Sequence, residues 1–491
     1  METSIELSRR TLLAAGLTGV LASLWLEPAT AAGVTFSHIL GRPTRNTIAL
    51  SVLATGSANA YVEYGRSKTK LSFKSESKLV NSSTPTVFEL VDLAPSSKVF
   101  YRLRYKGLSD SKFATGSTLS FSTAKSVGKS FAFTVQGDTH PERAGKMFNA
   151  DLYTVMMKNV AAQQPDFHVL LGDDFSIDPL IGKNLATQAN VEKIYATHRK
   201  WLSISGRSVP LFLVNGNHEQ AAKYLLDGTA TNPAVLAGNA RLKYFPLPEP
   251  NTFYTGDTIQ VENLGNPRDY YAWTWGDATF ITLDPYWHSK SAVDNVAGVS
   301  NSENATNKKS GSGAGKTKDL WNTGIGDEQY AWLKKTLETS DSKYIFVFAH
   351  HVMGTGRGAV EVSYDYEWGG NDPAGKTTFA EQRPGWELPI HDLMVKHKVS
   401  IFFQGHDHIF VTQARDGLIY QSMPNPADNT FTMFNSEAYK TGKKAANSGH
   451  VRVSVSASNA KVEYFLAARS KDTSRKNMAL AHRYIVKPRA I

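Results

Sequence analysis

The chain has 491 residues, of which 41% are hydrophobic and 20% charged, and these proportions fit a globular protein with more than one domain. It contains no cysteine, which excludes disulfides, thiolate nucleophiles and thiolate metal ligands. The formal net charge of +10 favours anionic partners such as phosphate esters, nucleic acid or acidic polymers. No stripe of Lys and Arg interleaved with aromatic residues indicates a dedicated nucleic-acid module.

The first 31 residues have the features of a targeting segment. Residues 8–13 (SRRTLL) match the twin-arginine pattern, an apolar stretch follows at 12–26, and residues 29–31 (ATA) match a small-x-small cleavage site. A membrane anchor is the alternative, but the apolar stretch is short for a bilayer span. We therefore predict a twin-arginine signal peptide at 1–31, export by the twin-arginine machinery, a periplasmic or secreted protein, and no stable membrane span after cleavage.

Residues 34–124 predict a small all-β unit. Short alternating runs recur between turn residues, at 47–54, 60–64, 87–93, 99–105 and 117–123. This spacing is typical of a β-sandwich. None of these residues has an obvious chemical role, so we interpret the unit as a packing partner.

From residue 131 onward, predicted strands alternate with predicted helices, which is typical of a layered α/β fold. The predicted helices are at 147–163, 186–202 and 327–339, and a hairpin is predicted from 270–275 and 278–283. Three final strands, at 409–414, 451–456 and 462–466, are expected to complete a second sheet. Two segments, 287–326 and 352–384, read as insertions to which the sequence assigns no role.

Five apolar runs end in residues that can bind a metal ion. The runs end in GDTH (Asp138, His140), GDD (Asp173, Asp174), GNHE (Asn217, His218, Glu219), HH (His350, His351) and GHDH (His406, Asp407, His408). Ligands of α/β sheets bind beyond the carboxyl ends of the strands, so the five motifs predict one O/N metal site. Because side chains alternate along an extended chain, we expect Asp138 and His140 to share a face, and likewise His406 and His408.

In this order, the five motifs resemble those of the calcineurin-like metallophosphoesterases. The pieces VEYG (62–65), LAPSSKVFYRLRY (93–105) and FSTA (121–124) resemble a fibronectin type III-like domain, which commonly precedes the catalytic domain in the purple acid phosphatase branch. The resemblance implies an α/β fold: a two-sheet αββα metallophosphoesterase sandwich at 130–491, preceded by a small all-β fibronectin type III-like sandwich at 34–124. It also implies two divalent or mixed-valence metal ions, with Mn, Fe and Zn not distinguished.

The resemblance further implies the ligands of the two ions. One ion is expected on Asp138, His140, Asp173 and His408, and the other on Asp173, Asn217, His350 and His406, with Asp173 bridging. Two divalent ions, two ligating carboxylates and one hydroxide together keep a positive charge, which attracts a phosphoryl oxygen. Asp174 is therefore not expected to be a ligand.

The implied reaction is hydrolysis of a phosphate ester by attack of a metal-bridging hydroxide, with His218 as the general acid. Glu219 is expected to orient His218, with an unrelated surface role as the alternative. Candidates for substrate contact are His351, Arg357 and Tyr364, with packing as the alternative for each.

One departure from the purple enzymes concerns Ser176, which stands where they have the tyrosine ligand, so no purple chromophore is expected. The substrate is expected to be a phosphorylated small molecule or polymer, and the residues do not separate a monoesterase from a diesterase. Two other hypotheses stay open. One is a non-catalytic cell-envelope or polyanion-binding protein on the same fold, and the other is a nuclease.

Overall fold

The structure is a computed structural model that describes residues 33–219, 224–291, 293, 320–352, 357–372 and 374–490. The signal peptide predicted at 1–31 and most of the insertion at 287–326 lie outside these residues. Within the described part of the chain, no helix combines the length and the apolar character that a membrane span requires. The fold class is the predicted one: an N-terminal all-β region followed by a layered α/β region.

The first sheet of the described residues has nine strands, in the order β23-β22-β21-β10-β11-β12-β1-β2-β6. Their bounds are β1 (Phe36–Gly41), β2 (Ile48–Ala54), β6 (Thr86–Leu90), β10 (Phe131–Gln136), β11 (Phe167–Leu170), β12 (Leu211–Leu213), β21 (Gly449–Val455), β22 (Ala460–Leu466) and β23 (Leu480–Val486). The neighbours β10, β11 and β12 are parallel. The assignment of 451–456 and 462–466 to the second sheet was wrong, because β21 pairs antiparallel with β10 and β22 pairs with β21.

The second sheet has eight described strands, in the order β13-β14-β15-β16-β17-β19-β18-β20. Their bounds are β13 (Thr255–Gly256), β14 (Tyr271–Trp275), β15 (Ala278–Thr282), β16 (Tyr344–Phe348), β17 (Ile401–Gln404), β18 (Phe410–Arg415), β19 (Leu418–Ser422) and β20 (Lys443–Ala445). The predicted hairpin is confirmed as β14 and β15, which are antiparallel. Strands β15, β16 and β17 are parallel, so β16 and β17 end at one edge of this sheet.

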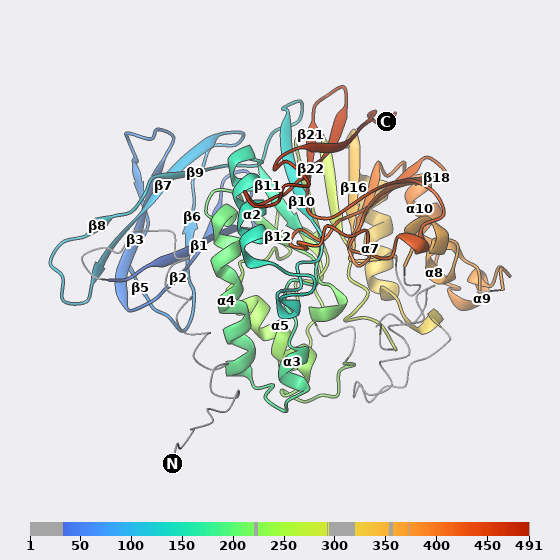
Figure 1. Ribbon diagram of the computed structural model, residues 1–491, viewed down its shortest axis with the longest axis horizontal. Coiled ribbons are helices and arrows are strands. Elements are labelled where there is room, and N and C mark those ends of the chain that lie inside the picture. Colours follow the sequence, from blue (N-terminus) through green and yellow to red (C-terminus); the bar gives the residue numbers. More distant parts are fainter. Residues whose placement is uncertain are drawn as a thin grey trace, which may run out of the picture.

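The N-terminal β region has a third sheet in the order β4-β3-β7-β8, with β5 paired to β3 and β9 paired to β7. Its strands are β3 (Ala58–Gly65), β4 (Phe73–Lys74), β5 (Lys78–Val80), β7 (Lys98–Gly107), β8 (Ala114–Thr115) and β9 (Leu119–Ser122). Apolar side chains of this sheet share a buried core with those of β1, β2 and β6. Strand β1, which the sequence did not predict, pairs parallel with β12 at Gly41 and Leu211. The N-terminal strands therefore continue the first sheet of the α/β region (Figure 1), and the boundary drawn between residues 124 and 130 stays a prediction.

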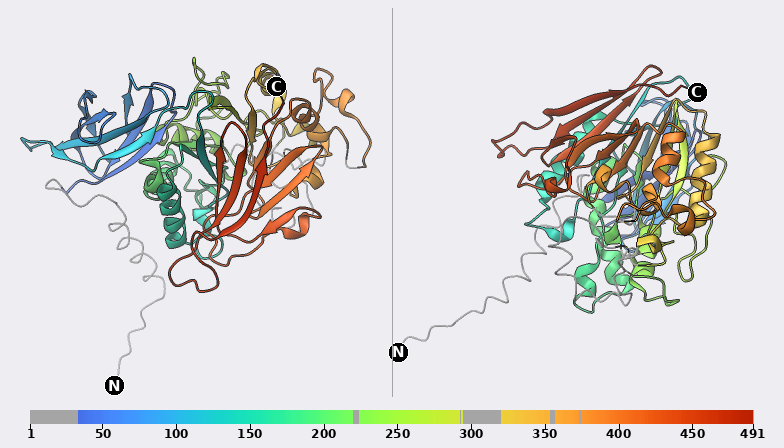
Figure 2. Two further views of the ribbon diagram at one scale, coloured as in Figure 1. Left: turned by 90° about the horizontal axis from the view of Figure 1, so that it is seen from above. Right: turned by 90° about the vertical axis from the view of Figure 1, so that its right-hand side faces the viewer.

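Helices cover the outer face of each α/β sheet, as Figures 1 and 2 show. The described helices are α2 (Ala150–Gln163), α3 (Asp178–Ile181), α4 (Gln188–Gly206), α5 (Pro233–Tyr244), α7 (Gly326–Thr339), α8 (Tyr366–Gly369), α9 (Phe379–Gln382) and α10 (Ile390–Lys396). Helices α2, α4 and α5 pack on the first sheet, and α7, α8 and α10 pack on the second. Helix α2 begins three residues later than predicted because the Asn149 side chain accepts from Leu152 N and caps it there.

The layer between the two sheets is rich in aromatic side chains. The ring centroid of Phe133 on β10 lies 5.3 Å from that of Phe167 on the first sheet. It lies 5.2 Å from the ring centroid of Phe280 and 5.3 Å from that of Phe346, both on the second sheet, so one side chain contacts both sheets. Fully buried side chains of this size each contribute about 1.5–3 kcal/mol through burial. This core fixes the two sheets, and hence the strand ends that carry the motifs, relative to each other.

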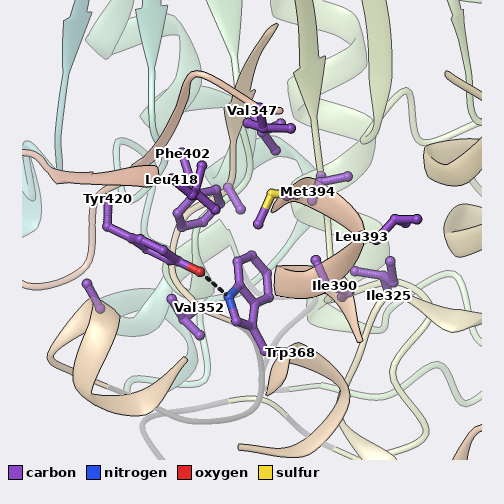
Figure 3. Packing of buried hydrophobic residues seen from close by; sticks show 14 of the residues in the cluster. Ile325, Val347, Val352, Trp368, Ile390, Leu393, Met394, Phe402, Leu418 and Tyr420 are labelled. Atoms are coloured by element: carbon purple, nitrogen blue, oxygen red, sulfur yellow. Dashed lines mark hydrogen bonds between the residues drawn. The ribbon is translucent and has the colours of Figure 1, made fainter. Parts of the chain in front are cut away.

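The insertion at 352–384 is anchored by Trp368, whose indole lies in the apolar core outside the second sheet (Figure 3). Its Nε1–H donates to the hydroxyl of Tyr420 on β19 at 2.9 Å. Phe402, Met394 and Ile390 surround the indole. A buried indole with its N–H satisfied holds the insertion firmly on the sheet.

Candidate metal centre

The five motifs follow the carboxyl ends of strands in both sheets. Strands β10, β11 and β12 of the first sheet lead to Asp138, Asp173 and Asn217, and β16 and β17 of the second lead to His350 and His406. All seven predicted ligands are at most 4% exposed. The structure therefore brings the motifs of two sheets into one buried centre.

Four predicted ligands form the first cluster: Asp138, His140, Asp173 and His408. Nε2 of His140 lies 3.0 Å from Nε2 of His408 and 3.4 Å from Oδ2 of Asp173. Nε2 of His408 lies 3.5 Å from Oδ1 of Asp138. The ligating atoms thus face one point, as the family resemblance implied for the first ion.

The second cluster comprises Asp173, His350 and His406, and Asn217 completes it. Nε2 of His350 lies 3.2 Å from Oδ2 of Asp173 and 3.0 Å from Oδ1 of Asn217. Nδ1 of His406 lies 3.2 Å from the same Asn217 oxygen. Oδ2 of Asp173 is therefore shared by both clusters, which is the position that a bridging carboxylate requires.

The lone pairs in these clusters fit a metal cation. A carbonyl oxygen only accepts, so Nδ1 of His350 carries the proton that it donates to Leu171 O at 2.7 Å. In the neutral ring Nε2 is then an acceptor, and it faces Asp173 Oδ2 and Asn217 Oδ1, which are acceptors too. Acceptors that converge without a proton between them repel, and a bound cation removes this repulsion.

The first cluster has the same arrangement. Nδ1 of His140 bonds the Glu142 carboxylate at 2.8 Å, which leaves the lone pair of its Nε2 directed at His408. Without an ion the protein must neutralise the carboxylates by protons. Burial alone would lower the pKa of His350, but Asp173 and Asp138 raise it to about 10.

The backbone at four of the ligands is left-handed. The φ angles are 48° at His140, 56° at Asp173, 66° at His406 and 52° at His408, a region that costs energy for residues other than glycine and is concentrated at functional sites. The expectation of an extended chain at the paired ligands was therefore wrong, although Asp138 and His140 do meet in one cluster as expected. His406 and His408 point to different clusters because the chain turns at both residues.

Glu219 holds two motif loops together and does not orient His218, so that expectation was also wrong. Its carboxylate accepts from the backbone N–H groups of Asp173 at 2.9 Å and of Gly216 at 2.5 Å. It also accepts from Asp174 N at 2.9 Å and Phe175 N at 3.0 Å. Burial and repulsion from the Asp173 carboxylate raise the pKa of Glu219 to about 7.

His218 is oriented by Asp178 instead. Its Nδ1 lies 3.0 Å from Asp178 Oδ2, and its Nε2 lies 3.1 Å from Nη2 of Arg143. The ring stands nearly perpendicular to that of His140, with 5.0 Å between centroids. Sequence reasoning missed Asp178 and Arg143, although both lie within five residues of a predicted ligand, in short helices that follow β11 and β10.

Two of the three candidates for substrate contact, His351 and Arg357, lie beside His406 of the second cluster. The third, Tyr364, lies beside Arg415 at the end of β18. The His351 ring is buried, 4.7 Å from that of His406. Arg357 donates to His406 O at 2.7 Å and to Asp407 Oδ1 at 3.1 Å, so it supports the loop that carries two ligands. Tyr364 is 45% exposed, and Cζ of the Arg415 guanidinium lies 3.7 Å above the centroid of its ring. Substrate contact by these residues stays a prediction.

Other buried polar residues have structural partners. Asp174 accepts from Thr139 Oγ1 at 2.8 Å and from Gln136 Nε2 at 3.2 Å, and it belongs to neither cluster. His168 bonds Thr134 and Gln136 in the core. The position of Asp174 agrees with the expectation that it is not a ligand, and His168 is a core residue of β11 outside the motifs.

The fold and the clusters together define a metallophosphoesterase type of protein, in which two sheets bring Asp, Asn and His ligands to one centre. Residues 131–410, more than half of the chain, match the model of the calcineurin-like phosphoesterase family. The chain therefore belongs to this family and is a metal-dependent phosphoesterase, as the motifs predicted.

One solved structure extends the likeness in fold beyond the family region. A structure titled as that of PhoD is 14% identical, with a TM-score of 0.60, and the match covers 92% of this chain and 88% of that one. Two weaker matches are GAP50, the anchor in the inner membrane complex of Plasmodium (15% identity, TM-score 0.34, 74% and 90% covered), and the phosphopantetheinyl hydrolase PptH from Mycobacterium tuberculosis (15% identity, TM-score 0.29, 61% and 91% covered). No curated protein matches the sequence.

Proposed function

We propose that the protein is an exported phosphoesterase that uses two divalent metal ions, and that His218 is the general acid of its reaction. The observation that carries this proposal is the sharing of Asp173 Oδ2 between the two ligand clusters, with His218 beside them. When bound, two ions at these clusters would polarise a phosphoryl oxygen and lower the pKa of a water molecule.

The ligands have a second task, which is to fix the position of His218. Its backbone N–H donates to Asp173 Oδ1 at 2.8 Å, so the acid and the shared carboxylate are tied together. The Asp178 carboxylate accepts from Nδ1 and fixes the orientation of the ring. His218 can then supply a proton from Nε2 to the leaving oxygen of the ester.

Arg143 is the group that we assign to the phosphoryl oxygens. Its guanidinium faces Nε2 of His218 in the structure, and a guanidinium binds phosphate oxygens far better than it binds a neutral imidazole. We infer that Arg143 turns to the phosphoryl group when substrate binds. This exchange would leave Nε2 of His218 free to hold the proton that the leaving group needs.

The compartment and the substrate class are parts of the same proposal. The twin-arginine motif at 8–13 and the cleavage motif at 29–31 support export to the periplasm or the medium. The net positive charge suits a phosphorylated small molecule or polymer. Replacing Arg9 and Arg10 by Lys should abolish export of the full chain, as measured by cell fractionation.

The first experiment compares p-nitrophenyl phosphate with bis-p-nitrophenyl phosphate, using the purified protein with added Mn²⁺ or Zn²⁺ and Asp173→Asn as the control. Preference for the first substrate indicates a phosphomonoesterase, and preference for the second indicates a phosphodiesterase. If neither is hydrolysed above the Asp173→Asn background with either metal, the proposal fails. Retention of the inactive protein on heparin would then favour the polyanion-binding alternative.

A further inference from the structure

A third group of metal-ligating side chains lies outside the catalytic centre: Asp257, Asp269 and His288. Asp257 directly follows β13, Asp269 precedes β14, and His288 lies in the segment that follows β15. The ligating atoms of the three side chains all lie within 4.8 Å of one another. The group shares no residue with the two clusters described above.

The carboxylates of this group are buried and only half satisfied. Asp257 is 1% and Asp269 0% exposed. One oxygen of each accepts a backbone N–H, from Ile259 at 2.8 Å and from Tyr270 at 2.9 Å. The other oxygen of each, and Nε2 of His288, are buried without a hydrogen-bond partner.

These three unsatisfied atoms face one another. Nε2 of His288 is 3.3 Å from Oδ2 of Asp269, and Oδ2 of Asp257 completes the group. Two buried carboxylates at this spacing repel, and burial together with Asp269 raises the pKa of Asp257 to about 8. Without a metal ion the group must hold protons: burial alone would lower the pKa of His288, but the carboxylates of Asp269, Asp284 and Asp257 raise it to about 9. Buried polar atoms that converge in this way are costly to leave unpaired, and a divalent cation would take the place of these protons.

We propose that Asp257, Asp269 and His288 bind one divalent cation at a site separate from the catalytic centre. Two carboxylate oxygens and one imidazole nitrogen suit Zn²⁺ or Mn²⁺, while Ca²⁺ and Mg²⁺ prefer oxygen ligands alone. With three protein ligands, the remaining positions are open to water. The site joins three chain segments that are otherwise separate in sequence.

The segment that carries His288 also contacts the catalytic centre. Asp284, four residues before His288, accepts from Nδ2 of Asn215 at 2.7 Å, and Asn215 is two residues from Asn217. A cation at the new site would fix this segment and thereby support the loop that presents Asn217. Its role is structural, and the proposal does not depend on which ester the protein hydrolyses.

The test counts the metal bound by the whole mature protein. Protein stripped with a chelator is dialysed against Zn²⁺, and bound zinc per chain is measured by mass spectrometry. The variants Asp257→Asn and His288→Gln are compared with the parent and with the surface control Asp341→Asn. Each comparison is repeated in the Asp173→Asn background, which separates this site from the catalytic one.

We expect both variants to lose one zinc per chain in both backgrounds, and the control to lose none. A zinc-dependent increase in melting temperature should remain in Asp173→Asn and should disappear when His288→Gln is added. Equal zinc counts in parent and variants would overturn the proposal and would leave a proton shared by the two carboxylates as the explanation. Because Asp257 is fully buried and its replacement could unfold the chain, His288→Gln, with a side chain that is 13% exposed, decides the test in that event.

Discussion

Oδ2 of Asp178 lies 3.0 Å from Nδ1 of His218, and this contact orients the ring of the proposed general acid. Asp178 is the first residue of α3, a helix of four residues. The carboxylate lies beside His218 because the loop after β11 is joined to the GNHE loop, where Glu219 accepts from Asp174 N and Phe175 N. A histidine held in this way presents its second nitrogen in a fixed direction.

His218→Ala should lower kcat by about 10²–10⁴-fold for alkyl phosphates, because loss of a general acid penalises esters whose leaving oxygen needs a proton. The loss should be much smaller for p-nitrophenyl esters, since nitrophenolate leaves without protonation. Asp178→Asn should show the same dependence on leaving group with a smaller loss. Measuring kcat across a series of esters with leaving groups of graded pKa checks this prediction, and an equal loss for all esters would contradict the role of acid.

Arg143→Ala should lower kcat/KM by about 10–100-fold, which corresponds to the loss of one charge-assisted hydrogen bond. Arg143→Lys should recover part of this loss, because it restores the charge without the fork of donors. The exposed neighbour Lys146 provides a matched control, and Lys146→Ala should leave kcat/KM within a factor of two or so. Unchanged kinetics in Arg143→Ala would exclude contact with the phosphoryl group.

Glu219→Gln should destabilise the protein by about 1–3 kcal/mol, because the amide nitrogen of Gln cannot accept the backbone N–H groups that the carboxylate oxygen accepts now. The measurement is the urea midpoint of unfolding. The exposed control Glu387→Gln should change stability by less than about 0.5 kcal/mol. If Glu219→Gln were as stable as the parent, the carboxylate would not be holding the two loops.

The protein should lose stability as the pH falls below about 6.5 toward 3, in part because of His38 on β1. Burial, with repulsion from Arg207 and Arg199, lowers the pKa of His38 to about 3. Between pH 6.5 and 3, His38 binds a proton in the unfolded chain but stays neutral in the folded protein, and this favours unfolding. Above pH 6.5 His38 is neutral in both states, so it costs no stability there. At pH 5 this one residue should cost on the order of 2 kcal/mol.

The check on this prediction is the melting temperature as a function of pH. His38→Phe should make the decrease between pH 6.5 and 4 less steep, because phenylalanine does not titrate. His482→Phe, at a less buried position on β23, should have a smaller effect. A pH profile of His38→Phe that parallels the parent would contradict the argument.

Much of the centre was predictable from local patterns. A short apolar run predicts a buried strand, and the polar motif after it marks where the strand leaves the core. The run and the motif together therefore predict which polar side chains stand at the end of the strand. The seven predicted ligands meet in two clusters for this reason, and the family and the fold class were predicted correctly. Sequence could not place β21 and β22, since antiparallel strands of similar composition fit either sheet and only the contact with β10 decides.

The chain by itself determined which residue types stand at the ends of the strands, and so the chemistry of the centre. The tertiary structure alone decided how they are directed. The family resemblance already assigned His406 and His408 to different ions, but the left-handed backbone that directs them there is not visible in their spacing. Glu219 binds loop amides, where a contact with His218 was expected. Asp178 and Arg143 reach His218 from separate loops, and Asp257, Asp269 and His288 come from three segments. Such contacts depend on where loops pack against each other, and no local sequence pattern encodes that.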